Sequence, residues 1–465
     1  MAQGKLPAKD VVVLLPGILG SVLQCDGKDV WAMSRGALLR GLLSLGASVQ
    51  RLALQSDDPN KPDLGDGVAA TRLMPDVHLI PGFWKIDGYS RIKDVLTSRF
   101  SFVEGKNWFD FPYDWRRDNR VAAQRLAEQA PQWLHRWRQE SGSSEAKLVL
   151  LGHSMGGLVS RAFLELFGGW QYTRALITFG TPYRGSLNAL DFLANGYQKG
   201  VGPLKLDLTS FLRSLTSVYQ LLPIAPCIDD RSGTLRRVTE VPSLPTGFDG
   251  QRALAARTDF HDAIAHAVDA NGGPGRYDIH PVVGIFQDTM VSARLQDGEL
   301  TVLASDPNGD DDGDGTVPRW SATPLELADQ PVGTFVTDKH GSLQNVDAVL
   351  NQVSGILSWK KTGHKRASPF DGFKLKVDDL VPSGEPVPVQ LETQGPSDKV
   401  VVTVQNADTG RAAGRRTLKR RPDGSFQGNL RALPSGVYRI TAEDASGAGL
   451  SPVHDIFVVA GDPDL

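Results

Sequence analysis

Cysteine is scarce in this sequence, and so are long apolar runs. The two cysteines, Cys25 and Cys227, are too few for a disulfide framework, so we expect reduced thiols, with a single bridge between them as the alternative. The apolar run from 11 to 15 ends at Pro16-Gly17, and no segment approaches the roughly 18 apolar residues of a transmembrane helix. Residues 1–10 lack the apolar region of a signal peptide. We therefore expect a cytoplasmic protein without a transmembrane segment.

An excess of charge of one sign is also lacking. The formal net charge is −3, which gives no electrostatic basis for binding nucleic acid. Hydrophobic residues make up 40% and charged residues 22% of the chain, as in ordinary globular proteins. A chain of 465 residues is too long for one compact core, so the length predicts two or three domains.

The most informative segment is Gly152-His153-Ser154-Met155-Gly156, which has the pattern G-x-S-x-G. A short apolar run at 147–151 precedes it, and apolar residues at helical spacing follow it over 158–167. Strand, turn and helix form the context that a nucleophile elbow requires, and glycines beside the serine let strand and helix approach closely. The segment therefore predicts an α/β-hydrolase fold with Ser154 as nucleophile.

Strands and helices alternate along much of the chain, which predicts a parallel α/β sheet. The alternation stops over about 184–275, and an insertion of this length indicates a cap or lid, with one helix over 208–222. The alternation then resumes, so we expect a catalytic domain at 1–365. The remaining expected elements are strands at 11–15, 108–111, 175–179, 280–286 and 335–336, helices at 31–54, 89–96, 120–140 and 346–359, and a hairpin at 297–298.

The sequence pattern changes after a polar linker at 360–368. Seven short β-like runs follow at a spacing of roughly ten residues, separated by turn residues. This pattern predicts a C-terminal all-β domain at 370–465, an immunoglobulin-like sandwich. Because the catalytic candidates all precede the linker, we expect this domain to fold alone and to be dispensable for chemistry. Its partner is unknown.

A serine nucleophile needs a base, an acid and donors for the oxyanion. In this fold class the acid and then the histidine follow the serine. His340 lies in a polar loop between the last strand and the last helix, where a base would reach the sheet edge. The acid we favour is Asp314, in a glycine-flanked loop, and the alternative is Asp288, at the end of the preceding strand.

The loop that contains Asp314 is rich in aspartate. Asn308, Asp310 and Asp312 before a glycine mimic the start of a calcium-binding loop, but position twelve would be Arg319, where a bidentate glutamate is needed. A solvated loop is the simpler interpretation, and we expect no metal and no organic cofactor.

Backbone N–H groups should stabilise the oxyanion. The residue after the nucleophile, Met155, is the first candidate donor. The second is Ile18, in the glycine-bearing loop after the first strand, and the alternative interpretation of that loop is a plain turn.

Several motifs occur together in a fixed order along the chain, and together they resemble the motifs of a known protein family. The chain resembles the lecithin:cholesterol acyltransferase family, which includes lysosomal phospholipase A2 and phospholipid:diacylglycerol acyltransferase, and is similar to a soluble member of bacterial type. The matching segments lie within 10–358: 15–21, 81–83, 112–116, 152–157, 221–223, 313–318 and His340. The resemblance implies that Ser154 is the nucleophile, Asp314 the acid and His340 the base, with Ile18 and Met155 as oxyanion donors.

Two features depart from that family. Its secreted members have a signal peptide and a disulfide-closed lid loop, whereas Cys25 has no nearby cysteine here, and the C-terminal sandwich is not part of the family pattern.

The resemblance implies a serine acylhydrolase or acyltransferase that forms an acyl-enzyme from a lipid ester, at a membrane or micelle surface if the substrate is aggregated. The alternatives are an esterase or deacylase of a non-lipid or glycolipid ester and a non-catalytic binding protein. The sequence leaves the acyl donor and acceptor, head-group and chain-length preference and oligomeric state open.

Overall fold

The computed structural model describes residues 4–31, 51–74, 78–80, 84–201, 204–305, 309, 312–330, 332–358 and 371–460. Several predicted features fall largely or wholly outside these ranges. They are most of the helix at 31–54, the motif at 81–83, Asn308 and Asp310 of the calcium-like loop, and the linker at 360–368. The boundary expected between 365 and 370 also lies outside them, so the domain limits remain predictions.

A six-stranded sheet forms the centre of the first domain, in the order β17-β14-β9-β8-β1-β7, and every neighbouring pair is parallel. Every residue of β1 and β8 is buried, as expected of strands covered on both faces. The predicted parallel α/β sheet is confirmed. Its strands are β1 (Val11–Leu15), β7 (Trp108–Asp110), β8 (Leu148–His153), β9 (Thr173–Phe179), β14 (Asp278–Gly284) and β17 (Thr334–Val336).

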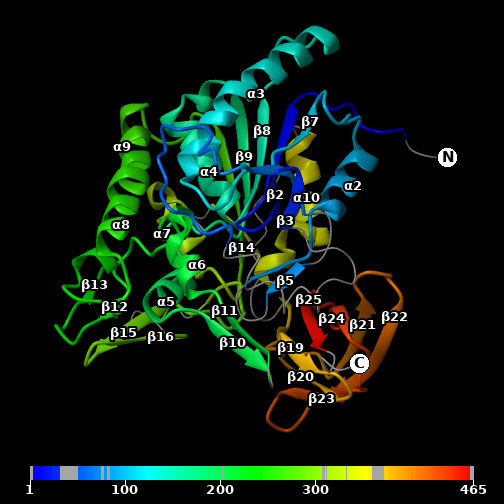
Figure 1. Ribbon diagram of the computed structural model, residues 1–465. Helices are drawn as coiled ribbons and strands as arrows, with labels where there is room; N and C mark the ends of the chain where they lie inside the picture. The colour runs from blue at the N-terminus through cyan, green and yellow to red at the C-terminus, as the bar shows by residue number, and fades with distance from the viewer. Residues whose placement is uncertain are drawn as a thin grey trace.

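Helices lie against the central sheet in this layered core (Figure 1). Helices α3 (Asn119–Ser141) and α4 (Met155–Leu166) pack together, and α2 (Ser90–Arg99) packs with α10 (Asp347–Leu357). Helix α3 begins where the Asp118 side chain accepts a hydrogen bond from the N–H of Arg120, and it ends at Gly142 with a φ of 69°. A small antiparallel sheet of β2 (Ser21–Cys25), β3 (Lys28–Trp31) and β4 (Val68–Leu73) follows the loop after β1, and β5 (His78–Ile80) pairs with β6 (Trp84–Ile86).

The insertion at 184–275 does not contain the single helix predicted over 208–222. The helix is broken into α6 (Thr209–Ser214) and α7 (Thr216–Tyr219), because Leu215 is extended, with φ −79° and ψ 122°. The guanidinium of Arg252 donates to the carbonyl oxygens of Arg213 and Ser214, at 2.5 and 2.9 Å. A side chain from a later helix thus satisfies the carbonyl groups that the break leaves without helical partners.

The other elements of the insertion are short. They are α5 (Leu187–Asn195), β10 (Gln198–Val201), β11 (Leu204–Asp207), β12 (Ile228–Asp229), β13 (Leu235–Arg236), η2 (Val238–Glu240), α8 (Gly250–Ala255), η3 (Ala256–Asp262) and α9 (Ala263–Ala270). Strands β15 (Ser292–Gln296) and β16 (Glu299–Leu303) form the predicted hairpin, with positive φ at both Asp297 and Gly298.

The C-terminal region is all-β, as predicted, and its two sheets share one apolar core. The seven predicted runs correspond to β18 (Lys374–Val377), β20 (Val387–Glu392), β21 (Lys399–Asn406), β22 (Ala412–Lys419), β23 (Phe426–Leu430), β24 (Gly436–Asp444) and β25 (Val453–Ala460). The described residues contain one further strand, β19 (Leu380–Pro382), which pairs in parallel with β25. Three residues that end in proline carry too little pattern to be recognised as a strand.

The two regions lie against each other (Figure 1), and partly buried polar contacts join them. Lys85 forms ion pairs with Asp379 and Asp455, at 2.5 and 2.9 Å. Arg439 is paired with Asp87, and Nδ1 of His454 lies 2.8 Å from Asp338. Asp338 is two residues before His340, so the C-terminal region contacts the loop that carries the predicted base.

Candidate active site

Ser154 occupies a strained turn between β8 and α4, with φ 51° and ψ −124°. Such a conformation costs a residue other than glycine about 1–3 kcal/mol and persists only where the surroundings enforce it. The neighbouring glycines make room for this turn. A Cβ on Gly156 would lie 2.5 Å from the carbonyl oxygens of Leu15 and Pro16, and one on Gly152 would lie 2.8 Å from the Cα of Gly157. The predicted strand–turn–helix arrangement is present.

The structure brings together the three residues that the sequence placed in one site. Oγ of Ser154 lies 3.0 Å from Nε2 of His340, and Nδ1 of His340 lies 2.7 Å from Oδ2 of Asp314. The three residues are 6%, 6% and 1% exposed, respectively. They come from the elbow, from the loop after β17 and from the loop after β16, which meet at one edge of the sheet.

The hydrogen bonds of Asp314 determine which ring nitrogen of neutral His340 carries the proton. Its Oδ1 accepts from the N–H groups of Thr316 and Val317, at 2.9 and 2.7 Å. Its Oδ2 therefore faces Nδ1 of His340 as an acceptor, and the proton of the neutral ring lies on Nδ1. Nε2 is then free to accept the proton of the Ser154 hydroxyl.

The alternative acid, Asp288, lies elsewhere, and so does the buried histidine of the insertion, His261. Asp288 is 57% exposed at its side chain and is paired with Lys374 at 2.5 Å, not with His340. His261 is buried in the insertion, where its Nε2 donates to the carbonyl oxygen of Gln220 at 2.8 Å. Burial lowers the pKa of His261 to about 4, so it is a neutral core residue at pH 7.

Both predicted oxyanion donors lie on segments beside Ser154. Met155 is the first residue of α4, so its N–H has no acceptor within the helix and lies at the positive end of the helix dipole. Ile18 follows Gly17, and a Cβ on Gly17 would lie 3.0 Å from Cβ of Ser154. The hydroxyl of Tyr113 donates to the carbonyl oxygen of Pro16 at 2.8 Å, which anchors the start of the loop.

Two further residues contact this loop, and the sequence analysis assigned neither a role. The hydroxyl of Tyr89 lies 2.8 Å from the backbone N of Gly17 and 3.0 Å from Nδ1 of His153. Nε2 of His153 lies 3.1 Å from the carbonyl oxygen of His340. Burial and the neighbouring His340 lower the pKa of His153 to about 3. Nothing in the sequence pattern joins Tyr89 to residues this distant along the chain.

No group of three or more histidine, cysteine, aspartate or glutamate side chains among the described residues could hold a metal ion. Of the calcium-like loop, Asp312 is described, and its carboxylate accepts from the backbone N–H groups of Phe286 and Gly313. Both cysteines are free, as expected. None of the described helices is long and apolar enough to cross a membrane.

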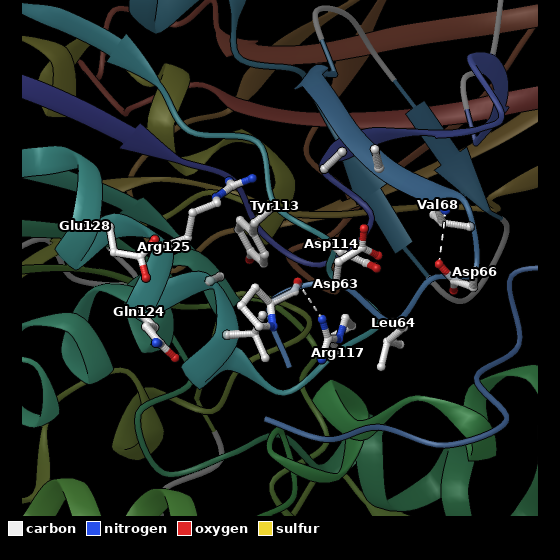
Figure 2. A pocket seen from close by; sticks show the side chains of 15 residues that line it. Asp63, Leu64, Asp66, Val68, Tyr113, Asp114, Arg117, Gln124, Arg125 and Glu128 are labelled. Carbon is white, nitrogen blue, oxygen red and sulfur yellow. Dashed lines mark hydrogen bonds between the residues drawn. The ribbon is translucent and has the colours of Figure 1, made fainter. Parts of the chain in front are cut away.

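The described residues line several cavities. The one in Figure 2, of about 270 Å³, is lined by Tyr113, Asp114 and Arg117 in the segment before α3 but by no residue of the Ser154–His340–Asp314 set. A smaller one, of about 200 Å³, is lined by Asp314 and His340 and also by Asp379, Asp455 and Ile456 of the C-terminal region. The third, of about 330 Å³, lies between α4 and the insertion, and its apolar wall includes Leu158, Ile224, Ile264 and Leu325.

Comparisons with known proteins point to the family that the motifs resemble. Residues 83–243 match the model of the lecithin:cholesterol acyltransferase family. Lecithin-cholesterol acyltransferase-like 4 of Arabidopsis thaliana is 31% identical over 133 residues, which cover 26% of this chain and 24% of that relative. The chain therefore spans about a quarter of the length of the curated relative that it matches.

Similar solved structures are distant. A chain of the Tle4–Tli4 complex is 17% identical, with 77% of this chain and 97% of that chain covered and a TM-score of 0.42. The propeptide form of the Bacillus licheniformis lipase BlEst2 is 13% identical, with 98% and 94% covered and a TM-score of 0.36. Likenesses this weak carry no argument about function.

The parallel sheet and the serine at the turn between β8 and α4 define an α/β-hydrolase-like fold. The match of residues 83–243 and the curated relative support membership of the lecithin:cholesterol acyltransferase-like family, which is the family that the motifs predicted.

Proposed function

We propose that the protein is a serine acylhydrolase or acyltransferase that acts on lipid esters. The observation that carries the proposal is the continuous chain of hydrogen bonds from Ser154 through His340 to Asp314, at the elbow between β8 and α4. A buried acid, a correctly protonated imidazole and an activated hydroxyl are the components of nucleophilic acyl transfer.

The reaction follows from the atoms present. Nε2 of His340 takes the proton of Ser154 while Oγ attacks the ester carbonyl, and the N–H groups of Met155 and Ile18 donate to the oxyanion of the tetrahedral intermediate. The intermediate collapses to an acyl-enzyme as His340 returns the proton to the leaving alcohol. Water or an acceptor alcohol, deprotonated by His340, then attacks the acyl-enzyme and regenerates Ser154. None of these steps uses a cofactor.

The family match supports a lipid ester as the acyl donor. Helices α6 and α7 of the insertion do not add support for a lipid substrate. Phe211, Leu212 and Leu215 are at most 1% exposed, so they pack within the core and are not an open acyl-binding wall. A non-lipid or glycolipid esterase is the second candidate, because the cavity beside His340 is lined mainly by polar and charged residues.

We also propose that the domains extend over 1–365 and 370–465 and that the second is immunoglobulin-like. The two sheets with a shared core support this assignment.

The test is a chain-length series of p-nitrophenyl esters, together with phospholipid vesicles and covalent labelling by a fluorophosphonate. We expect labelling of the wild type but not of Ser154→Ala, faster turnover of long-chain than of short-chain esters, and higher rates on aggregated substrate. Strict preference for acetate would favour the second candidate, and a wild type that neither turns over esters nor becomes labelled would refute both.

A further inference from the structure

Tyr89 is a buried residue that links the two halves of the candidate site. It lies immediately before α2 and is 2% exposed. Its hydroxyl lies between the backbone N of Gly17, at 2.8 Å, and Nδ1 of His153, at 3.0 Å. The other ring nitrogen of His153, Nε2, lies 3.1 Å from the carbonyl oxygen of His340.

The direction of each hydrogen bond follows from chemistry. A carbonyl oxygen only accepts, so Nε2 of His153 carries a proton and donates to His340. Because burial keeps His153 neutral, its Nδ1 has no proton and accepts from the Tyr89 hydroxyl. The oxygen of that hydroxyl then accepts from the N–H of Gly17. Burial raises the pKa of Tyr89, so the hydroxyl keeps the proton that this arrangement needs.

The chain of hydrogen bonds joins the two segments whose relative position matters most for the proposed reaction. Gly17 precedes Ile18, the second oxyanion donor, and the far end of the chain is the backbone of the base, His340. The hydroxyl of Tyr89 therefore holds the start of the 17–20 loop by a hydrogen bond, and the N–H of Gly20 at the end of that loop donates to the carbonyl oxygen of Gly17 at 3.0 Å.

We propose that Tyr89 and His153 are positioning residues that hold the Ile18 N–H and His340 in the geometry of the transition state. The inference rests on the proposed acyl transfer. Neither residue touches the reacting atoms, and each acts through a hydrogen bond to the backbone of another. Their loss should therefore change kcat and leave KM almost unchanged, because the oxyanion forms only after the substrate is bound.

Tyr89→Phe is the direct test, because it removes one oxygen and keeps the ring. It leaves the N–H of Gly17 without its acceptor and frees the loop. We expect kcat to fall about 10- to 100-fold, in the range that a displacement of about 1 Å at a reacting centre causes. The rate of fluorophosphonate labelling of Ser154 should fall by a similar factor. The matched control is Tyr438→Phe. Tyr438 is another buried tyrosine, it lies in the C-terminal region, and its hydroxyl donates a hydrogen bond to the carbonyl oxygen of Pro434 at 2.7 Å.

His153→Gln is the second variant and covers the case in which Tyr89→Phe fails to fold. Because the two residues form one chain, the double variant should lose no more than the worse single variant. Inhibition by an alkyl boronic acid, which forms a tetrahedral anion on Ser154, should weaken in parallel with kcat.

The inference is overturned if both folded variants keep kcat within about twofold of the wild type, or if they raise KM without changing kcat. Failure of the proposed function itself is distinguishable, because then the wild type would show neither turnover nor labelling of Ser154.

Discussion

Replacing Asp314 with asparagine should abolish turnover through the tautomer of His340. The amide oxygen of an asparagine at 314 must accept from the N–H groups of Thr316 and Val317, which now donate to Oδ1 of the carboxylate. The amide NH₂ group then takes the place of Oδ2 and faces Nδ1 of His340, where it can only donate. The imidazole must present an unprotonated Nδ1, so its proton moves to Nε2, which can no longer accept the proton of Ser154.

The expected loss is about 10⁴-fold in kcat, as for the same change in serine proteases with this arrangement. At about 1.36 kcal/mol for each factor of ten, this is about 5.4 kcal/mol of lost transition-state stabilisation. The free energy of unfolding should change little, because asparagine has the same shape and still satisfies both backbone donors.

The assay is the steady-state hydrolysis of a soluble p-nitrophenyl ester, with thermal unfolding measured on the same samples. Asp288→Asn is the control, because Asp288 is the second aspartate candidate and is exposed and paired with Lys374. Its variant should keep near-normal kcat. A larger loss in Asp288→Asn than in Asp314→Asn would refute the assignment of the acid, and an Asp314→Asn enzyme that keeps more than a tenth of its activity would refute the tautomer argument.

Three further predictions concern the nucleophile and the contact between the two regions. Ser154→Ala, His340→Ala and the double variant should each lower kcat by a similar factor, on the order of 10³ or more, because the two residues act as a unit; additive losses would contradict this. Lys85→Met should lower the free energy of unfolding by about 3 kcal/mol or more, because it leaves the carboxylate of Asp455, which is 2% exposed, without its nearest cation. Chemical denaturation measures this free energy, and an unchanged midpoint would contradict the prediction. Truncation after Thr362 should lower the melting temperature of the catalytic region, because it removes Asp379 and Asp455, the two carboxylates that pair with Lys85. The activity of the truncated protein on a small soluble ester tests the prediction that the C-terminal region is dispensable for chemistry, and complete loss of that activity in a folded protein would contradict it.

The contact between the regions should also depend on pH. Burial opposes the charge of His454, but Asp338 and, more weakly, Asp87 raise its pKa above the ordinary value of 6.5, against the opposing charge of Arg91. A group whose pKa is raised by folding stabilises the fold fully below its unfolded pKa, and this contribution is lost as the pH rises through its folded pKa. Thermal stability should therefore fall as the pH rises through and beyond neutrality, and less so in His454→Gln. Equal pH dependence of the two proteins would contradict this assignment.

The elements predicted correctly are those whose signal is local. The apolar run of β8, the glycines around Ser154 and the amphipathic start of α4 lie within some twenty residues and require one another, so the elbow could be recognised without a structure. Asp314 and His340 were placed by chain order and by their loops. The contact of His340 with Ser154 joins residues 186 positions apart, and its contact with Asp314 joins two separate loops, so no local pattern in the sequence reports either contact.

The elements predicted wrongly or missed depend on contacts between distant residues. The helix is broken at Leu215 although the apolar residues around it have helical spacing. Arg252 satisfies the carbonyl groups of Arg213 and Ser214 at this break, from 39 and 38 residues away. Tyr89 reads as an ordinary residue at the start of a helix, yet its partners are Gly17 and His153, 72 and 64 residues away. Periodicity cannot reveal either contact, because it reports which face of an element is buried and not which side chain meets it.

The polar contact between the two regions links their packing to the candidate site. Asp338 accepts from both the backbone N–H and Nδ1 of His454, at 3.1 and 2.8 Å, and the next residue, Lys339, lies 3.6 Å from Asp455. The residue after that is His340, whose N–H donates to the carbonyl oxygen of Asp314 at 2.9 Å. The loop of the base is thus held by the acid on one side and by β25 of the C-terminal region on the other. The loop that carries His340 is therefore part of the contact between the two regions.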